Sequence, residues 1–235
     1  RSSDLCGEKI EYLQGGREMS CHFCGKTELA HVHCGQGHYI CESCHGERYL
    51  RPMRSFMKLA EGDNPLLLAE GMLNKIPLPM LGCEHAWIAV AALMVALKNH
   101  GPLKITEEMM EEALSRTRKQ AIGAYCGLTG ICGMAPAMGA VFSVILGASC
   151  PGDLETSTTM RAVSKVIAAI ADETGPCCCK NFLRTSLITA AQVLQETLQI
   201  DLPVAAEIYC IDSDRHPHGC REERCRYYWK HAPMG

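Results

Sequence analysis

Hydrophobic and polar residues follow a helical period through most of the chain after Pro52. Residues 84–99 (EHAWIAVAALMVALKN) are apolar on almost every face and are followed by Gly101-Pro102, which predicts a buried helix. Residues 107–120 follow Thr106 and carry acidic residues in the first turn and basic residues in the last, which predicts an N-cap and a surface helix. Three further patterns predict helices at 138–148, 156–172 and 181–199.

The first fifty residues have a different texture. They are rich in Cys, His and Gly, and no helical period in them lasts longer than a turn or two. No series of strands is evident after residue 50. We therefore expect a mainly α protein with a small N-terminal module over 1–50, and an all-helical domain over 51–235 that ends in a cysteine-rich tail.

The segment 121–150 carries no charged residue and is longer than the ~20 apolar residues that a membrane span needs. Glycines and Pro136 interrupt it, however, and leave only a short apolar helix. We therefore expect this segment to form protein core or an interface between two copies of the chain, with no contact with a membrane.

Composition narrows the class further. The 235 residues have a formal net charge of -3, and 21% of them are charged. This balance predicts one or two soluble domains and no electrostatic binding to nucleic acid or membranes. The chain starts with polar residues and contains sixteen cysteines. Without an apolar leader we expect a cytoplasmic protein, whose thiols bind metals or serve redox chemistry.

Two Cys-x2-Cys pairs lie in the N-terminal module, Cys21 with Cys24 and Cys41 with Cys44. This spacing is typical of a zinc ribbon or treble clef, in which four thiolates surround one structural ion. The spacing does not select the metal, and iron is an alternative.

Two other cysteines of the module, Cys6 and Cys34, are surplus to one tetrahedral ion. Together with a histidine they could form a second metal site. Ser3 stands where a further Cys-x2-Cys pair would have cysteine, which weakens this expectation.

Glu84 and His85 lie at the start of the predicted buried helix. A carboxylate and an imidazole at this place could act as an acid/base pair or bind a metal. The alternative is a helix-capping Glu and a core His.

Cys126 and Cys132 lie in a glycine-rich loop that leads into an apolar helix. Glycine lets the backbone approach a bulky ligand, and a helix N-terminus favours a thiolate. The loop could supply a redox dithiol, cluster ligands or a substrate cradle, or it could simply pack closely around two buried thiols.

Cys177-Cys178-Cys179 is followed in the tail by Cys210, Cys220 and Cys225. Three cysteines in a short irregular tail predict a metal centre, because little apolar material is present to order the segment. Consecutive side chains cannot all face one centre, so we expect Cys178 or Cys179 to be the fourth ligand of an iron-sulfur cluster.

Taken together, these motifs resemble an uncharacterised prokaryotic family, common in anaerobes, that sometimes accompanies methyltransferase or radical-SAM modules. The features that carry the resemblance are the ribbon ending His38-Tyr39-Ile40-Cys41-Glu42-Ser43-Cys44-His45, the Glu84-His85 helix start, the Cys126 to Cys132 loop, Gly175-Pro176 with Cys178-Cys179-Lys180, and the closing Cys210, Cys220 and Cys225. The resemblance implies a cytoplasmic metal protein and no particular reaction. Ser3 and Cys83 depart from the expected pattern.

Three functions are compatible with the sequence. The first is a binding protein with structural zinc and an iron-sulfur cluster, which serves electron, sulfur or methyl transfer to a partner. The second is an iron-sulfur lyase or desulfidase whose open iron acts as a Lewis acid, with Glu84 and His85 handling protons. The third is a homo-oligomeric scaffold that has only structural metals and a dimer interface within 127–148.

Overall fold

The computed structural model describes residue 3 and residues 5–123 and 125–232. The chain divides into two compact units, Arg1–Pro52 and Met53–Gly235, two residues beyond the boundary expected from composition. One helix, α1 (Glu42–Leu59), begins in the first unit and ends in the second.

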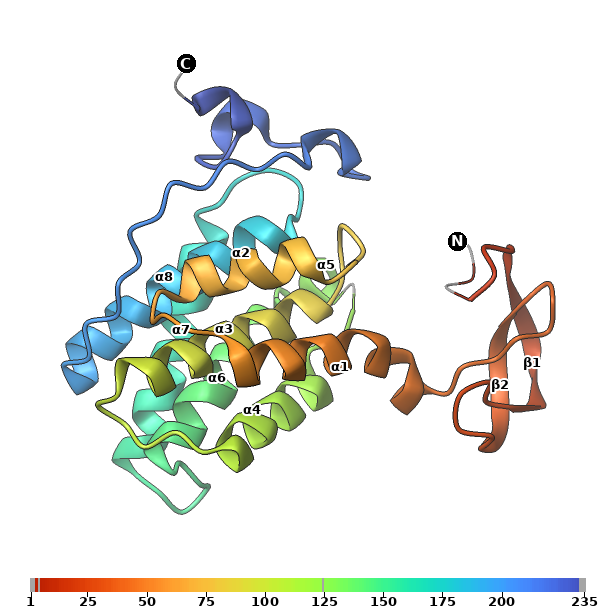
Figure 1. Cartoon of the computed structure of the whole chain (residues 1–235), viewed down its shortest axis with the longest axis horizontal. Coiled ribbons are helices and arrows are strands. Elements are labelled where there is room, and N and C mark those ends of the chain that lie inside the picture. Colours follow the sequence, from red (N-terminus) through yellow and green to blue (C-terminus); the bar gives the residue numbers. More distant parts are fainter. Residues whose placement is uncertain (1–2, 4, 124, 233–235) are drawn as a thin grey trace. The chain divides into compact units, whose positions relative to one another are not determined.

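The N-terminal unit is built on an antiparallel hairpin (Figure 1). Strand β1 (Ile10–Ser20) pairs with β2 (Thr27–Cys34), and the register runs from Ser20 opposite Thr27 to Ile10 opposite Cys34. An irregularity between Tyr12 and Arg17 interrupts the pairing. Most positions of β1 are exposed, so this sheet buries too little apolar surface to account for its own stability.

Helix α1 corrects the expectation that helical structure starts near Pro52. The helix begins ten residues earlier, and Pro52 lies inside it. Proline removes one backbone donor from a helix interior. Good helix formers on both sides of it, among them Glu, Arg, Leu, Met and Lys, favour continuation through this position.

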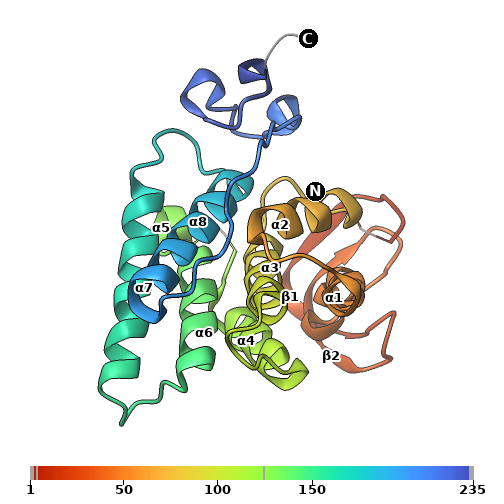
Figure 2. The ribbon, with the colours of Figure 1, turned by 60° about the vertical axis from the view of Figure 1, so that its left-hand side comes forward.

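The second unit is a bundle of helices arranged around α3 (Figures 1 and 2). The remaining helices are α2 (Pro65–Lys75), α4 (Glu107–Gln120), α5 (Cys126–Thr129), α6 (Met134–Leu146), α7 (Leu154–Ala171) and α8 (Cys179–Leu198). Helix α3 (Glu84–His100) packs against α2, α4, α6 and α8. Its residues from Ile88 to Leu97 are fully buried, which explains why the sequence is apolar on every face there.

The structure confirms the predicted mainly α class and two specific helix predictions. The pattern at 84–99 forms the buried helix α3. Thr106 caps α4, where its hydroxyl accepts a hydrogen bond of 3.3 Å from the backbone amide of Met109.

The helices predicted at 156–172 and 181–199 are α7 and α8, and each begins two residues earlier than predicted. Helix α6 departs further from its predicted range. Helix α6 begins at Met134, four residues before the predicted start, with Pro136 in its first turn, where a proline costs no intrahelical hydrogen bond. Helix α2 was not predicted. Asn64 caps it by accepting hydrogen bonds from the backbone amides of Leu66 and Leu67, and Pro65 fills its first position.

The uncharged segment lies inside the helical unit. Helix α6 has 13 residues and is about 20 Å long, against a bilayer core of ~30 Å. Among the described residues, no helix is both long enough and apolar enough to cross a membrane. Val141 is fully buried where α6 packs against α3, α4, α7 and α8. The apolar face of α6 is therefore covered by the chain itself, and the interface expected at 127–148 is not needed to bury it.

The C-terminal tail turns back after α8 and returns to the N-terminal end of that helix (Figure 2). The Asn64 side-chain amide donates a hydrogen bond of 3.0 Å to the Ala205 carbonyl and holds the tail against the start of α2. An isolated bridge then joins Cys210 to Tyr228. Three short 3-10 turns complete the tail, Ser213–Arg215, Glu222–Arg224 and Trp229–His231.

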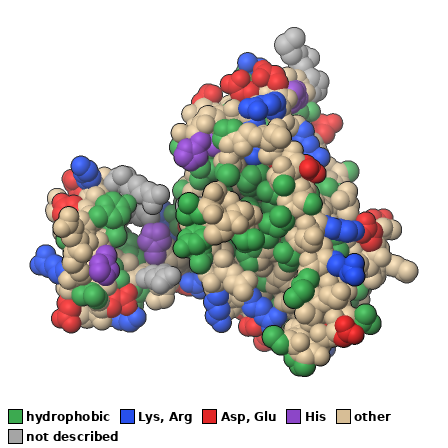
Figure 3. All heavy atoms as spheres, turned by 180° about the vertical axis from the view of Figure 1, so that it is seen from behind, with side chains coloured by type: hydrophobic (Ala, Val, Ile, Leu, Met, Phe, Trp, Pro, Cys, Tyr) green, Lys and Arg blue, Asp and Glu red, His purple; other side chains and the backbone are tan. Residues whose placement is uncertain are grey.

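The surface of the helical unit carries charges of both signs. In the view from behind, hydrophobic side chains gather on one face, with Lys, Arg, Asp and Glu around them (Figure 3). Ahead of α6, Leu128 of α5 and Ile131 after it expose apolar side chains.

Candidate metal centres

The first group of thiols lies in the N-terminal unit. Cys21 and Cys24 follow β1 in the turn of the hairpin, while Cys41 and Cys44 lie at the start of α1. The four sulfur atoms all lie within 4.8 Å of one another, and those of Cys24 and Cys41 are 3.7 Å apart. Tetrahedral zinc with Zn–S bonds of ~2.3 Å requires a sulfur–sulfur distance of about 3.8 Å. This group could therefore hold a metal ion with little movement of its side chains.

Backbone amides favour the thiolate form of one member of this group, Cys21. Burial opposes ionisation of Cys21, but hydrogen bonds from the amides of Cys41, Cys24 and Phe23 lower its pKa to about 6. The pKa of Cys44 moves the other way, to about 12, because its neighbours Cys41 and Cys24 interact with its neutral form. Four close thiols thus resist losing all their protons together, and a metal ion would remove that conflict.

The second group consists of Cys6, Cys34 and His38, whose ligand atoms also lie within 4.8 Å of one another. The two sulfurs are 3.6 Å apart, and Nδ1 of His38 is 3.4 Å from the sulfur of Cys34. The histidine that lies beside Cys6 and Cys34 in the expected second site is therefore His38. A hydrogen bond from the Ser3 side chain is the main cause that lowers the pKa of Cys6, so the serine lies beside the trio.

In the helical unit, the side chains of the triplet Cys177-Cys178-Cys179 do not all face the same side of the backbone. Cys178 is extended, with φ -130° and ψ 107°, and it precedes α8. Successive side chains of an extended segment point in opposite directions. Cys178 lines a cavity together with Cys210, Cys220 and Cys225, whereas Cys179 is not part of that lining.

This cavity, which we call the tail cavity, lies between the start of α8 and the returning tail. It is narrow, with about 20 Å³ of accessible space, room for about one water molecule, and it opens partly to solvent. Beside the four cysteines, its lining includes Asn181, Arg184, Asp212, His216 and Arg221. The Asn181 side-chain amide lies 3.5 Å from the sulfur of Cys225.

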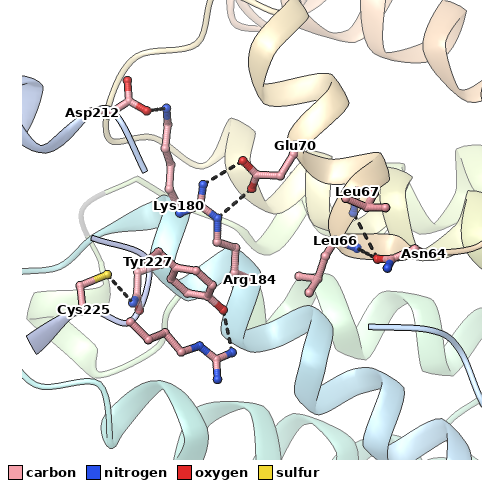
Figure 4. A network of polar contacts seen from close by, with 11 residues as sticks. Asn64, Leu66, Leu67, Glu70, Lys180, Arg184, Asp212, Cys225 and Tyr227 are labelled. Atoms are coloured by element: carbon pink, nitrogen blue, oxygen red, sulfur yellow. Dashed lines mark hydrogen bonds and ion pairs between the residues drawn. The ribbon is translucent and has the colours of Figure 1, made fainter. Parts of the chain in front are cut away.

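Ion pairs fix the walls of the cavity (Figure 4). Arg184 binds Glu70 of α2 through two hydrogen bonds of 2.7 and 2.9 Å. Its guanidinium lies 4.8 Å from the centre of the Tyr227 ring. Although burial opposes the charge, Glu70 and the Cys210 thiolate hold the pKa of Arg184 above its usual value. Lys180 pairs with Asp212 in the same way and ties α8 to the tail.

Arg221 is a second buried cation at this cavity. It donates a hydrogen bond of 2.9 Å to the Pro176 carbonyl and pairs with Glu173 at 3.4 Å. Its remaining terminal nitrogen is buried and has no hydrogen-bond partner among the described residues. A buried donor of this kind costs free energy unless an acceptor occupies the cavity.

The glycine loop places its cysteines near the other members of the triplet. The sulfur of Cys126 is 3.9 Å from that of Cys177. Cys132 is 8% exposed, and burial, followed by smaller opposing and reinforcing effects, raises its pKa to about 11. Metal-free Cys132 is therefore a protonated thiol at neutral pH.

Glu84 and His85 begin α3 as predicted, but the described contacts do not join them. His85 is fully buried, and its Nδ1 lies 3.1 Å from the Gly82 carbonyl. Burial lowers its pKa to about 4, so the imidazole is neutral at pH 7. Its Nε2 has no hydrogen-bond partner in the described part of the chain. This environment favours a core histidine, the alternative left open by the sequence.

Several residues around these centres carry no motif. His38 was one of several histidines in a His-rich stretch, and spacing alone could not single it out. Arg184 and Arg221 look like ordinary surface charges in the sequence. Their role follows only from the return of the tail over α8, which brings them beside Cys210 and Cys225.

These features define a mainly helical, cysteine-rich protein with groups of side chains that could bind metal ions. The chain belongs to the family of unknown function DUF5714, which matches residues 53–228. The match covers most of the helical unit, including the cysteines from 83 to 225, and excludes the N-terminal hairpin. No significant match to the chain was found among curated proteins or among solved structures.

Proposed function

We propose that this protein transfers electrons to a partner protein through an iron-sulfur cluster held by Cys178, Cys210, Cys220 and Cys225. The observation that carries the proposal is the single cavity that these four side chains line. They come from two segments more than thirty residues apart, and no other feature of the sequence requires them to meet.

The four sulfurs are not spaced for a single ion. Among the described residues, two groups of three or more ligand atoms lie within 4.8 Å of one another, and both are in the N-terminal unit. A single tetrahedral ion needs sulfurs about 3.8 Å apart. A cubane cluster holds its thiolates further apart, and the tail would have to move away from α8 to admit one, because the space between them holds about one water molecule.

The charge of the cavity also suits a cluster. Iron and sulfide ligated by four thiolates carry net negative charge, and the buried cations Arg184 and Arg221 line the same space. The unpartnered nitrogen of Arg221 would gain an acceptor in a cluster or thiolate sulfur. The protein thereby supplies hydrogen bonds and positive charge, which set the potential of such clusters.

Four protein ligands favour electron transfer over catalysis. A lyase or desulfidase of this type needs one iron with an open coordination position. The cavity supplies four thiols, and His85 is a buried neutral side chain whose described hydrogen bond goes to the backbone. Sulfur and methyl transfer would likewise need an open site, so we favour electron transfer.

The N-terminal unit fits structural zinc. Cys21, Cys24, Cys41 and Cys44 already stand at the distances of a zinc site, with one pair in a turn and the other at a helix start, as in a treble clef. We propose a second ion at Cys6, Cys34 and His38, with the hydroxyl of Ser3 or water in the fourth position.

The experiment is metal and acid-labile sulfide analysis of the full chain purified without oxygen. We expect brown protein with absorbance near 400 nm, and Cys178→Ser should lose the share of the iron, sulfide and absorbance that the cluster at Cys178, Cys210, Cys220 and Cys225 contributes. The exposed Cys150 offers a matched control, since Cys150→Ser should keep the colour. Colourless protein that carries zinc alone, even after incubation with ferrous iron and sulfide, would overturn the cluster.

The same sample tests the expected anaerobic setting and redox partner. A cluster in a cavity that opens to solvent should bleach in air, because oxygen reaches it. A physiological partner should oxidise the dithionite-reduced protein, and a cluster that is stable for days in air would contradict an obligately anaerobic role.

A further inference from the structure

We propose a second thiolate metal centre in the helical unit, an iron-sulfur cluster ligated from Cys83, Cys126, Cys132, Cys177 and Cys179. This centre is separate from the cluster proposed for the tail cavity, and its existence does not depend on that cluster. The five cysteines come from three places in the sequence, the start of α3, the loop around α5, and the triplet before α8.

The extended backbone at Cys178 gives the first argument. Because Cys178 faces the tail cavity, its neighbours Cys177 and Cys179 project from the other side of the segment. On that side the sulfur of Cys177 lies 3.9 Å from that of Cys126. The triplet therefore has one thiol for the tail cavity and two for another site.

The positions of Cys83 and Cys132 give the second argument. A methyl group added at Gly133 would lie 3.5 Å from the sulfur of Cys83, so the loop before α6 touches the start of α3. Cys132 directly precedes Gly133, so its backbone lies at this same contact between the loop and α3.

Helix N-termini supply the third argument. Cys83 is the N-cap of α3, Cys132 directly precedes the N-cap of α6, and Cys179 is the first residue of α8. The backbone of Met134 hydrogen-bonds Cys132, and that of Gly82 hydrogen-bonds Cys179. Three packed helices therefore direct their positive ends toward one group of sulfurs, an arrangement that stabilises thiolates.

The five thiols are only partly reached by solvent: Cys132 is buried, and the other four are half-buried. A cationic metal core would allow the ligands to ionise, and each would release its proton to solvent. Among the described residues, no three of these sulfurs lie within 4.8 Å of one another, so a single ion would require them to move.

The test is iron and sulfide stoichiometry of the full chain after anaerobic incubation with ferrous iron and sulfide. Two [4Fe–4S] centres predict about eight irons per chain. The triple variant Cys210→Ser/Cys220→Ser/Cys225→Ser should keep about four, and so should Cys83→Ser/Cys132→Ser/Cys179→Ser. If the second triple variant binds as much iron as the unchanged chain, the proposal fails, whatever happens to the tail cavity.

Alkylation of the unmutated chain tests the centre without relying on the folding of variants. Cys126 and Cys177 are half-exposed. Iodoacetamide should modify both after iron is removed by chelation and leave both unmodified in the iron-loaded protein, while the exposed Cys150 reacts in each case. Equal modification of Cys126 with and without iron would overturn the proposal. So would a Cys126–Cys177 disulfide in anaerobic protein, or zinc as the metal that these thiols hold.

Discussion

Arg184 and Glu70 form a two-bond ion pair that joins α8 to α2 at the base of the tail cavity. The side chain of Arg184 is 3% exposed and that of Glu70 is 20% exposed, so water screens the pair only on the carboxylate side. The same guanidinium supports the Tyr227 ring and approaches Cys210. The buried guanidinium of Arg184 thus connects α8, α2 and the C-terminal tail.

Removing the carboxylate should therefore destabilise the helical unit. Glu70→Gln leaves a buried guanidinium without its counter-charge, and we expect a loss of about 2–3 kcal/mol, reduced from the value of a fully buried pair by the partial exposure of Glu70. Urea unfolding followed by circular dichroism measures it. The matched control is Glu196→Gln at the exposed pair with Lys165, where the loss should stay below ~0.5 kcal/mol. Equal losses would contradict this account.

The burial of Val141 predicts that Val141→Asp unfolds the protein instead of splitting a dimer. A carboxylate placed among α3, α4, α7 and α8 has no described partner and should lower the melting temperature by about 10 °C or more. Met160→Asp, at an exposed position of α7, should leave it unchanged. A Val141→Asp chain that melts normally but has half the mass in solution would show that α6 forms an interface after all.

Loss of zinc should affect the N-terminal unit alone. Cys24→Ser removes one of four ligands, so we expect about one zinc fewer per chain and rapid proteolysis between 1 and 41, because the exposed hairpin has little core of its own. The helical signal from the second unit should persist, since that unit has its own core. The exposed Cys150 again gives a control in Cys150→Ser. Unchanged zinc content in Cys24→Ser would refute the assignment.

If the tail cavity holds the proposed cluster, the charge of Arg221 should help to set its reduction potential. Arg221→Gln removes a buried positive charge beside the cavity, which makes an added electron less favourable by ~1 kcal/mol and lowers the potential by about 50 mV. Redox titration of the iron signal measures the shift. Arg226→Gln, at an exposed guanidinium over the Tyr227 ring, should leave the potential nearly unchanged. A higher potential in Arg221→Gln would contradict the role.

Local sequence rules predicted the helices whose signals are local. The apolar run of α3 and the Thr106 cap of α4 depend on residues within one or two turns, and both are present in the structure. Pro52 and Pro136 do not break their helices, because proline is tolerated inside α1 and in the first turn of α6. The Asn64-Pro65 signal of α2 was available and was missed.

The candidate centres were predictable only in part, because their ligands meet through tertiary structure. The paired spacing of Cys21, Cys24, Cys41 and Cys44 encodes one site directly, and these side chains do converge. The choice between Cys178 and Cys179 depends on the extended backbone at Cys178 and on the path of a tail more than thirty residues later. No local pattern contains that information.

The return of the tail along α8 gives a metal there the effect of a cross-link. Joining Cys178 to Cys225 through one cluster would close a loop of about 47 residues and restrict the unfolded chain by about 4 kcal/mol, by analogy with a disulfide of that span. Loss of the cluster would then release the C-terminal tail from residue 200 onward and expose it to proteases. Protection of the tail from proteolysis would therefore show whether the protein still holds its iron.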